Sequence, residues 1–261
     1  MSGLGDLHCR YRAAPGDNQG ADLILFVHGI GCSGDDFAGA WDAPELAPHA
    51  LLAPDLPGSG RSPAATDDAG TMEAHARALR GAVDGLDYAR LHIVGHSLGG
   101  APTLLLARDA GAIKLASLVH IEGNLIAEDC SMMSRRTSEM DQATFVEQKF
   151  SRIVAASANS DDPQIQRWSP LLAQCDPASI YRSCCSLVAW SDGGELLEIF
   201  RALTVPKIYA YGEHTVLQPV LAAVGEIDKK CFDDTGHFVA TENPGAFYPW
   251  LAGWLARVCT R

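Results

Sequence analysis

Short runs of apolar residues alternate along this chain with longer segments of helical periodicity. The runs span 23–27, 51–54, 91–94, 115–121, 207–211 and 227–232, and a short strand is also expected near 7–12. Their continuous apolar character is typical of strands buried on both faces of a sheet. Helical patterns occupy 71–86, with Thr71 as its predicted N-cap, 98–110 and 244–258. We therefore predict an α/β fold with a mostly parallel sheet covered by helices on both faces.

The alternation of strands and helices stops between residues 124 and 203. This segment contains helical patterns only, at about 136–156, 163–174, 177–190 and 195–202, separated by polar breaks that contain proline or glycine. The strand pattern resumes afterwards. We therefore predict one core domain made of residues 1–123 and 204–261, with residues 124–203 as a helical insertion.

Composition narrows the classes of partner. A chain of 261 residues with 47% hydrophobic residues can bury one sizeable core. The net charge of −12 argues against nucleic acid and anionic membrane as partners, because both require a positive surface. No signal-peptide pattern or membrane-spanning run is present, so a cytoplasmic location is expected. The sequence leaves the oligomeric state open, a homodimer included.

Eight cysteines are present, at positions 9, 32, 130, 175, 184, 185, 231 and 259. Without a secretion signal, we expect them to be reduced thiols that pack as small apolar residues. No Cys-x-x-Cys or His/Cys ligand spacing occurs, so neither a metal site nor a cofactor is predicted.

The segment from Leu91 to Gly100 carries the strongest chemical signal. A short apolar strand pattern ends in Gly95-His96-Ser97-Leu98-Gly99 and continues into a helix rich in alanine and leucine. A serine on such a sharp turn is exposed to a base and to backbone N–H groups that stabilise an oxyanion. Glycines on either side avoid collisions where the chain reverses. Ser97 is therefore the predicted nucleophile.

Three further motifs accompany this turn in a fixed order. His28-Gly29-Ile30-Gly31 follows the first buried strand, the loop from Asp55 to Ser62 follows the next, and Gly236-His237-Phe238 lies near the end. Over about residues 20–260 the chain thereby resembles the α/β-hydrolase superfamily. Within it, the chain resembles the serine hydrolases that carry a helical cap. The resemblance implies that residues 124–203, here called the cap, close over Ser97 and shape the substrate pocket. It also implies that His237 is the catalytic base.

The acid of the catalytic triad departs from the common pattern of the family. The usual position, in a Gly-x-x-Asp pattern after the strand that follows the cap, is Thr215, whose neutral hydroxyl cannot stabilise an imidazolium. Glu122 stands at the carboxyl end of the strand before the cap, an edge that points toward the site. We assign Glu122 as the acid. Glu213 is the main alternative, and the further ones are Asp192, Asp233 or a site without an acid.

The remaining site residues follow from the same motifs. The backbone N–H groups of Ile30 and Leu98 are the expected oxyanion hole. Met132, Phe145 and Trp190 are the apolar cap residues expected to line the substrate cavity. Cys32 lies near the oxyanion loop, but no motif places a base beside it, so we interpret it as a buried packing residue.

The leading functional hypothesis is a serine hydrolase that cleaves a carboxylic ester, lactone or thioester of a small to medium apolar substrate through an acyl-enzyme. A serine rather than an aspartate at the turn argues against a haloalkane dehalogenase or epoxide hydrolase. Two alternatives remain open: a C–C bond hydrolase or cofactor-free lyase, and a small-molecule receptor with a slow triad.

Overall fold

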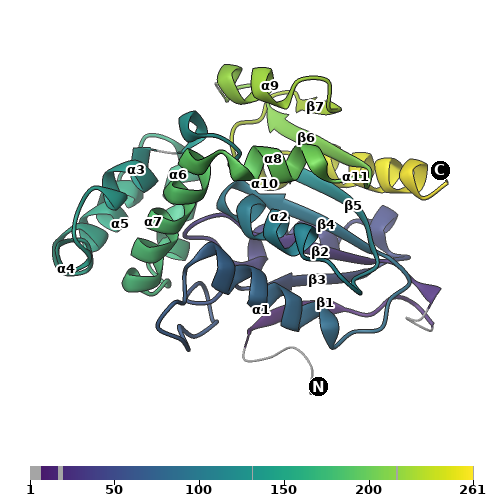
Figure 1. Cartoon of the computed structure of the whole chain (residues 1–261), viewed down its shortest axis with the longest axis horizontal. Helices are drawn as coiled ribbons and strands as arrows, with labels where there is room; N and C mark the ends of the chain where they lie inside the picture. Colours follow the sequence, from purple (N-terminus) through teal and green to yellow (C-terminus); the bar gives the residue numbers. More distant parts are fainter. Residues whose placement is uncertain (1–6, 17–19, 131, 216, 261) are drawn as a thin grey trace.

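The computed structural model describes residues 7–16, 20–130, 132–215 and 217–260. In these ranges seven strands form one sheet, with the order β1-β3-β2-β4-β5-β6-β7 (Figure 1). Only the pairing of β1 with β3 is antiparallel. The strands are β1 (Cys9–Arg12), β2 (Leu23–Val27), β3 (Ala50–Pro54), β4 (Leu91–His96), β5 (Leu115–Ile121), β6 (Lys207–Gly212) and β7 (Lys229–Phe232). The predicted α/β class and its strands are confirmed.

Two helical layers cover the sheet (Figure 1). The helices of the first layer are α1 (Met72–Asp84), α2 (Gly100–Arg108), α8 (Glu195–Ala202) and α9 (Gln218–Val224); those of the second are η2 (Gly34–Trp41), η3 (Pro44–Leu46), α10 (Val239–Glu242) and α11 (Pro244–Cys259). Strand β2 shows how both layers acquire a core. Leu23, Leu25 and Val27 pack in the first layer, whereas Ile24 and Phe26 pack in the second. Alternate side chains of a strand point to opposite faces, so a continuous apolar run serves both.

Helix α1 begins where the sequence predicted. The Thr71 hydroxyl accepts a hydrogen bond from the Ala74 amide at 3.1 Å, which satisfies one of the amides that a helix start leaves free.

No helix in the described ranges is both long enough and apolar enough to cross a membrane.

In the described part of residues 124–203, which leaves out residue 131, the regular elements are helices and no strand occurs. Its helices are η5 (Ala127–Asp129), α3 (Met132–Ser138), α4 (Gln142–Thr144), η6 (Phe145–Lys149), α5 (Phe150–Ala158), α6 (Pro163–Leu172), α7 (Pro177–Gly193) and α8. The single helix predicted at 136–156 is interrupted, because Asp141 caps a new helix by accepting from the Thr144 amide at 2.9 Å. Helix α8 returns to the sheet and buries Leu196 and Phe200 in the first layer.

Helix α7 fastens the cap to the rest of the chain. The Asp176 amide, just before α7, donates to the Gly58 carbonyl at 2.8 Å, and Ser183 donates to the Gly70 carbonyl at 2.8 Å. Arg182 donates to the Ala69 carbonyl at 2.6 Å. These contacts fix one side of the cap against loops that follow β3.

Two fully buried histidines make the fold sensitive to acid. Burial lowers the pKa of His75 to about 3 and that of His120 to about 4. As the pH falls, the unfolded chain, with ordinary histidine pKa values near 6.5, binds these protons first. Their contribution to stability is therefore complete above about pH 6.5 and is lost as the pH falls toward about 3.

We expect the free energy of unfolding to fall by about 2 kcal/mol for each of these two histidines between pH 7.5 and pH 5. Urea unfolding at the two pH values measures this fall, and His75→Gln should reduce it. The exposed His214→Gln is the matched control and should leave it unchanged. An equal fall in the wild type and His75→Gln would contradict the assignment.

Candidate active site

Ser97 sits on a strained turn between β4 and α2, at η4 (Ser97–Gly99). Its φ of 52° lies in the left-handed region that residues with a side chain rarely adopt. A side chain at Gly95 would meet Thr103, and one at Gly99 would meet the backbone carbonyls of Val27 and His28. The two glycines therefore let the turn pack tightly beneath the serine, as the sequence predicted.

A cavity of about 1180 Å³ lies between the cap and the carboxyl end of the sheet. Ser97, His237 and Glu122 all contribute to its wall, together with residues from α3, α5, α6 and α7. The structure thus brings the three residues predicted as a triad to one cavity, from three separate parts of the sequence.

His237 and Glu122 form a close hydrogen-bonded pair. The Nδ1 atom of His237 lies 2.6 Å from Oε2 of Glu122, whose side chain is 1% exposed, against 41% for His237. This leaves Nε2 of His237 as the ring nitrogen available to Ser97. No hydrogen bond joins Ser97 to His237 in the described contacts; such bonds are often looser before substrate binds.

The backbone around Glu122 holds its carboxylate in place. Glu122 has a φ of 43°, and its Oε1 atom accepts a hydrogen bond from the Gly212 amide at 2.8 Å. Glu213, the alternative acid, instead accepts from the Asp234 amide at 3.1 Å on the exposed surface. Thr215 lies on the cavity wall without a carboxylate to offer. Asp192 pairs with Arg135 in the cap. Among the candidate acids whose contacts are described, Glu122 is the one that contacts His237.

The loop at His28 lies directly beside the serine. A side chain at Gly29 would approach Cβ of Ser97 to 3.1 Å, so glycine permits this close contact. In the described part of the chain, the Ile30 amide has no recorded acceptor. Ile30 and Leu98, the predicted oxyanion donors, both contribute to the cavity wall.

Two buried histidines support this arrangement without touching the carboxylate. His28 Nε2 accepts from the Leu56 amide at 2.9 Å, and its Nδ1 lies 2.8 Å from the Gly29 carbonyl, consistent with a neutral ring. His96 Nε2 lies 2.9 Å from the His237 carbonyl. Burial and the charge of His237 hold the pKa of His96 well below its ordinary value. Both rings therefore position backbone around the site.

The Asp55 loop is also structural. The buried Asp55 carboxylate accepts from the Gly34 amide at 2.8 Å and from the Arg61 amide at 2.9 Å. It thereby ties the loop after β3 to the loop after β2.

Cys32 is buried, and burial together with Asp36 raises the pKa of its thiol well above the ordinary value. It therefore stays protonated, which fits a packing residue.

Two of the cap residues expected on the cavity wall lie elsewhere. Phe145 is fully buried in the cap's own core, where its ring centroid lies 5.9 Å from that of Tyr181. Trp190 faces α1, because its indole N–H donates to Glu73 at 2.9 Å. A helical layer needs its own apolar core and its own anchors, and these aromatic residues supply them. The side chain of Met132, the third expected residue, lies outside the described structure.

The sequence analysis missed the residues that do form the cap side of the cavity. Trp168 is the most informative, because its indole N–H donates to the Ile30 carbonyl at 2.8 Å and so joins the cap to the oxyanion loop. Arg136, Lys149 and Arg152 also line the cavity, and no hydrogen bond or ion pair is recorded for their side chains within the described ranges. The apolar face of α6 was the available signal for Trp168. The sequence contained no comparable signal for Arg136, Lys149 and Arg152.

Comparisons with known proteins identify the family of this chain. The sequence model described as the Alpha/beta hydrolase family matches residues 24–250. A 2-hydroxy-6-oxononadienedioate/2-hydroxy-6-oxononatrienedioate hydrolase from Cupriavidus pinatubonensis (strain JMP 134 / LMG 1197) is 24% identical over 271 residues, which cover 95% of this chain and 90% of the relative.

Solved structures show the same fold. An esterase from Thermogutta terrifontis has a TM-score of 0.75 at 19% identity, with 97% of this chain and 93% of that chain covered. An N-acyl homoserine lactonase solved with N-hexanoyl homoserine has a TM-score of 0.73 at 21% identity, with 96% and 93% covered. Because the family model spans most of the sequence, the chain belongs to the alpha/beta hydrolase family.

Proposed function

We propose that this protein is a serine hydrolase that cleaves a carboxylic ester, lactone or thioester of a small to medium apolar substrate. The observation that carries the proposal is the 2.6 Å contact of His237 with the buried Glu122, in the same cavity as the strained Ser97. A nucleophile, a base and a buried acid in this order are the parts that acyl transfer requires.

The proposed reaction follows from the positions of these groups. Ser97 Oγ attacks the carbonyl carbon of the substrate while His237 Nε2 accepts its proton, and Glu122 stabilises the resulting imidazolium. The Ile30 and Leu98 amides donate to the oxyanion. His237 then protonates the leaving group. Water, activated by His237, hydrolyses the acyl-enzyme and releases the acid.

The cap supplies the pocket in this proposal. Residues 124–203 form a lid over the core domain of residues 1–123 and 204–261, and the cavity lies between them. Met133, Ile153, Ile165 and Leu187 give its cap side an apolar surface that suits an acyl chain. Structures with the same fold include a named esterase and a named lactonase, which supports these two substrate classes.

A second candidate is hydrolysis of a C–C bond in a vinylogous diketone. The observation that favours it is the presence of Arg136, Lys149 and Arg152 on the cavity wall, where they suit a carboxylate-bearing substrate. The relative that covers nearly the full chain is named for such a hydrolase. Turnover of a p-nitrophenyl ester compared with that of a 2-hydroxy-6-oxodienoate distinguishes the two candidates.

Fluorophosphonate labelling tests whether the triad works at all. We expect rapid formation of a single adduct on Ser97, located by peptide mass spectrometry, because an activated serine attacks phosphorus as it attacks a carbonyl. Ser157→Ala, which alters another serine of the cavity wall, is the matched control and should label normally. Absence of the adduct would favour the alternative of a small-molecule receptor.

A further inference from the structure

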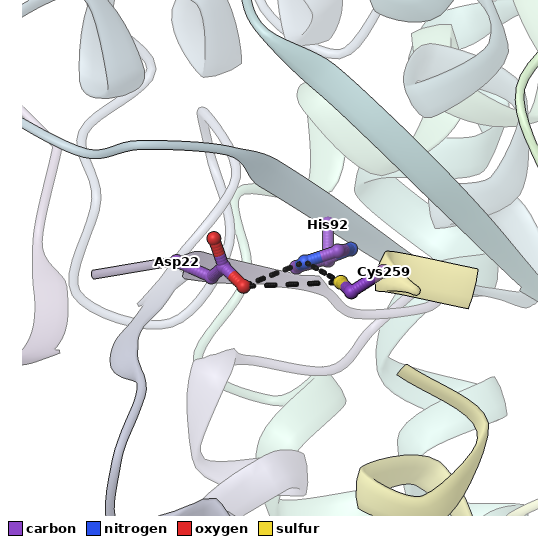
Figure 2. A group of neighbouring side chains, drawn as sticks. All are labelled: Asp22, His92 and Cys259. Atoms are coloured by element: carbon purple, nitrogen blue, oxygen red, sulfur yellow. Dashed lines mark hydrogen bonds and ion pairs between the residues drawn. The ribbon is translucent and has the colours of Figure 1, made fainter. Parts of the chain in front are cut away.

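Three side chains that metals commonly use as ligands meet at the end of the sheet opposite Ser97. Asp22 directly precedes β2, His92 is the second residue of β4, and Cys259 is the last residue of α11. Figure 2 shows the three side chains pointing toward one another from these separate elements. The active site lies at the other end of β4, so its chemistry does not use this cluster.

The spacing of the three atoms fits a tetrahedral metal ion. His92 Nε2 lies 3.4 Å from Asp22 Oδ2 and 3.7 Å from Cys259 Sγ, and the sulfur lies 3.9 Å from the same carboxylate oxygen. Zinc bond lengths of about 2.3 Å to sulfur and about 2.0–2.2 Å to nitrogen and oxygen place tetrahedral ligands roughly 3.4–3.6 Å apart. Shifts of a few tenths of an ångström would therefore complete the geometry.

We propose that Asp22, His92 and Cys259 bind a zinc ion. Thiolate, imidazole and carboxylate are the ligand types that zinc prefers, and three protein ligands leave a fourth position for water. On binding, the Cys259 thiol loses its proton to solvent, and the sulfur, nitrogen and oxygen each donate an electron pair to the ion.

Neighbouring groups already orient two of the ligands. His92 Nδ1 lies 2.7 Å from the hydroxyl of Ser117, its partner on β5, and this contact leaves Nε2 directed at the cluster. Asp22 is held by Arg90, whose Nε and Nη2 atoms donate to its two oxygens at 2.8 and 2.9 Å. Such contacts fix ring and carboxylate orientation around protein-bound zinc.

The consequence of metal binding would be structural. His92 is fully buried and Asp22 is 9% exposed, whereas Cys259 is half-buried near the end of the last helix. A zinc ion here joins α11 to the amino ends of β2 and β4. Bound metal should therefore stabilise the folded chain without changing the reactivity of Ser97.

Cobalt substitution tests the site directly. The reduced, chelator-treated full chain receives Co²⁺ without oxygen, and we expect a thiolate-to-cobalt absorption band that Zn²⁺ abolishes. Cys259→Ser should lose the band and bind Zn²⁺ at least about tenfold more weakly, since even changes behind the ligands cost about 10–100-fold. Cys231→Ser removes another half-buried cysteine and, as the control, should keep both properties.

Thermal unfolding provides a second measurement. Saturating Zn²⁺ should raise the Tm of the wild type and of Cys231→Ser but leave Cys259→Ser unchanged, with far-UV circular dichroism confirming that each variant is folded. A wild type without the cobalt band would overturn the proposal, as would a band that persists in Cys259→Ser. Neither result bears on the proposed hydrolase activity, which labelling of Ser97 measures separately.

Discussion

Replacing Ser97 by alanine is expected to abolish ester hydrolysis while leaving the fold intact. In the proposed mechanism the serine contributes the covalent step, whereas its side chain contributes little packing. Loss of a triad serine lowers kcat by up to about 10⁶, with the remaining rate coming from the oxyanion donors and binding. The measurement is kcat of the purified variant on a p-nitrophenyl ester, alongside its far-UV circular dichroism spectrum.

Ser157→Ala is again the matched control, since it removes another hydroxyl from the cavity wall and should keep most of the activity. Residual activity of Ser97→Ala above about a hundredth of the wild type would count against a serine nucleophile.

Glu122→Gln should keep the fold and lower kcat by about 10⁴, the cost of removing the charge from a triad acid. An amide retains the size of the side chain and accepts from the Gly212 amide, but it cannot stabilise the imidazolium of His237. Steady-state kinetics measure the loss, which should fall on kcat more than on KM, since the charge forms only during reaction.

Glu213→Gln is the control for this assignment. Glu213 is exposed and bonded to the Asp234 amide, away from His237, so its replacement should leave kcat close to that of the wild type. The opposite order of the two variants would place the acid directly after β6 instead of directly after β5.

The core of this protein could be predicted because its signals are local. A continuous apolar run, a glycine on either side of Ser97 and a threonine before α1 each report on a few neighbouring residues. The position of Glu122 also followed from local sequence, since the end of a parallel strand faces the site whichever helices cover the sheet. The structure then placed its carboxylate against His237.

The cap could not be predicted in the same way. Apolar residues of a small helical layer serve its own core, its contact with the sheet or the cavity, and periodicity does not distinguish among these uses. Phe145 and Trp190 therefore fell on other surfaces than the expected one, and Asp141 began a helix inside a continuous pattern. Ligand spacing in the sequence could not indicate the proposed zinc site either, because Asp22 and Cys259 are 237 positions apart.

The hydrogen bond from Trp168 to the Ile30 carbonyl connects the cap to the backbone of the oxyanion loop. Gly31, the next residue, has a φ of 66° and offers little resistance to rotation of the peptide between them. The indole therefore anchors the peptide that directly follows the Ile30 amide, the predicted oxyanion donor. A side chain of the cap thus helps to set the geometry of the loop beside Ser97, so a substitution at Trp168 should reach catalysis through the backbone and not through the triad.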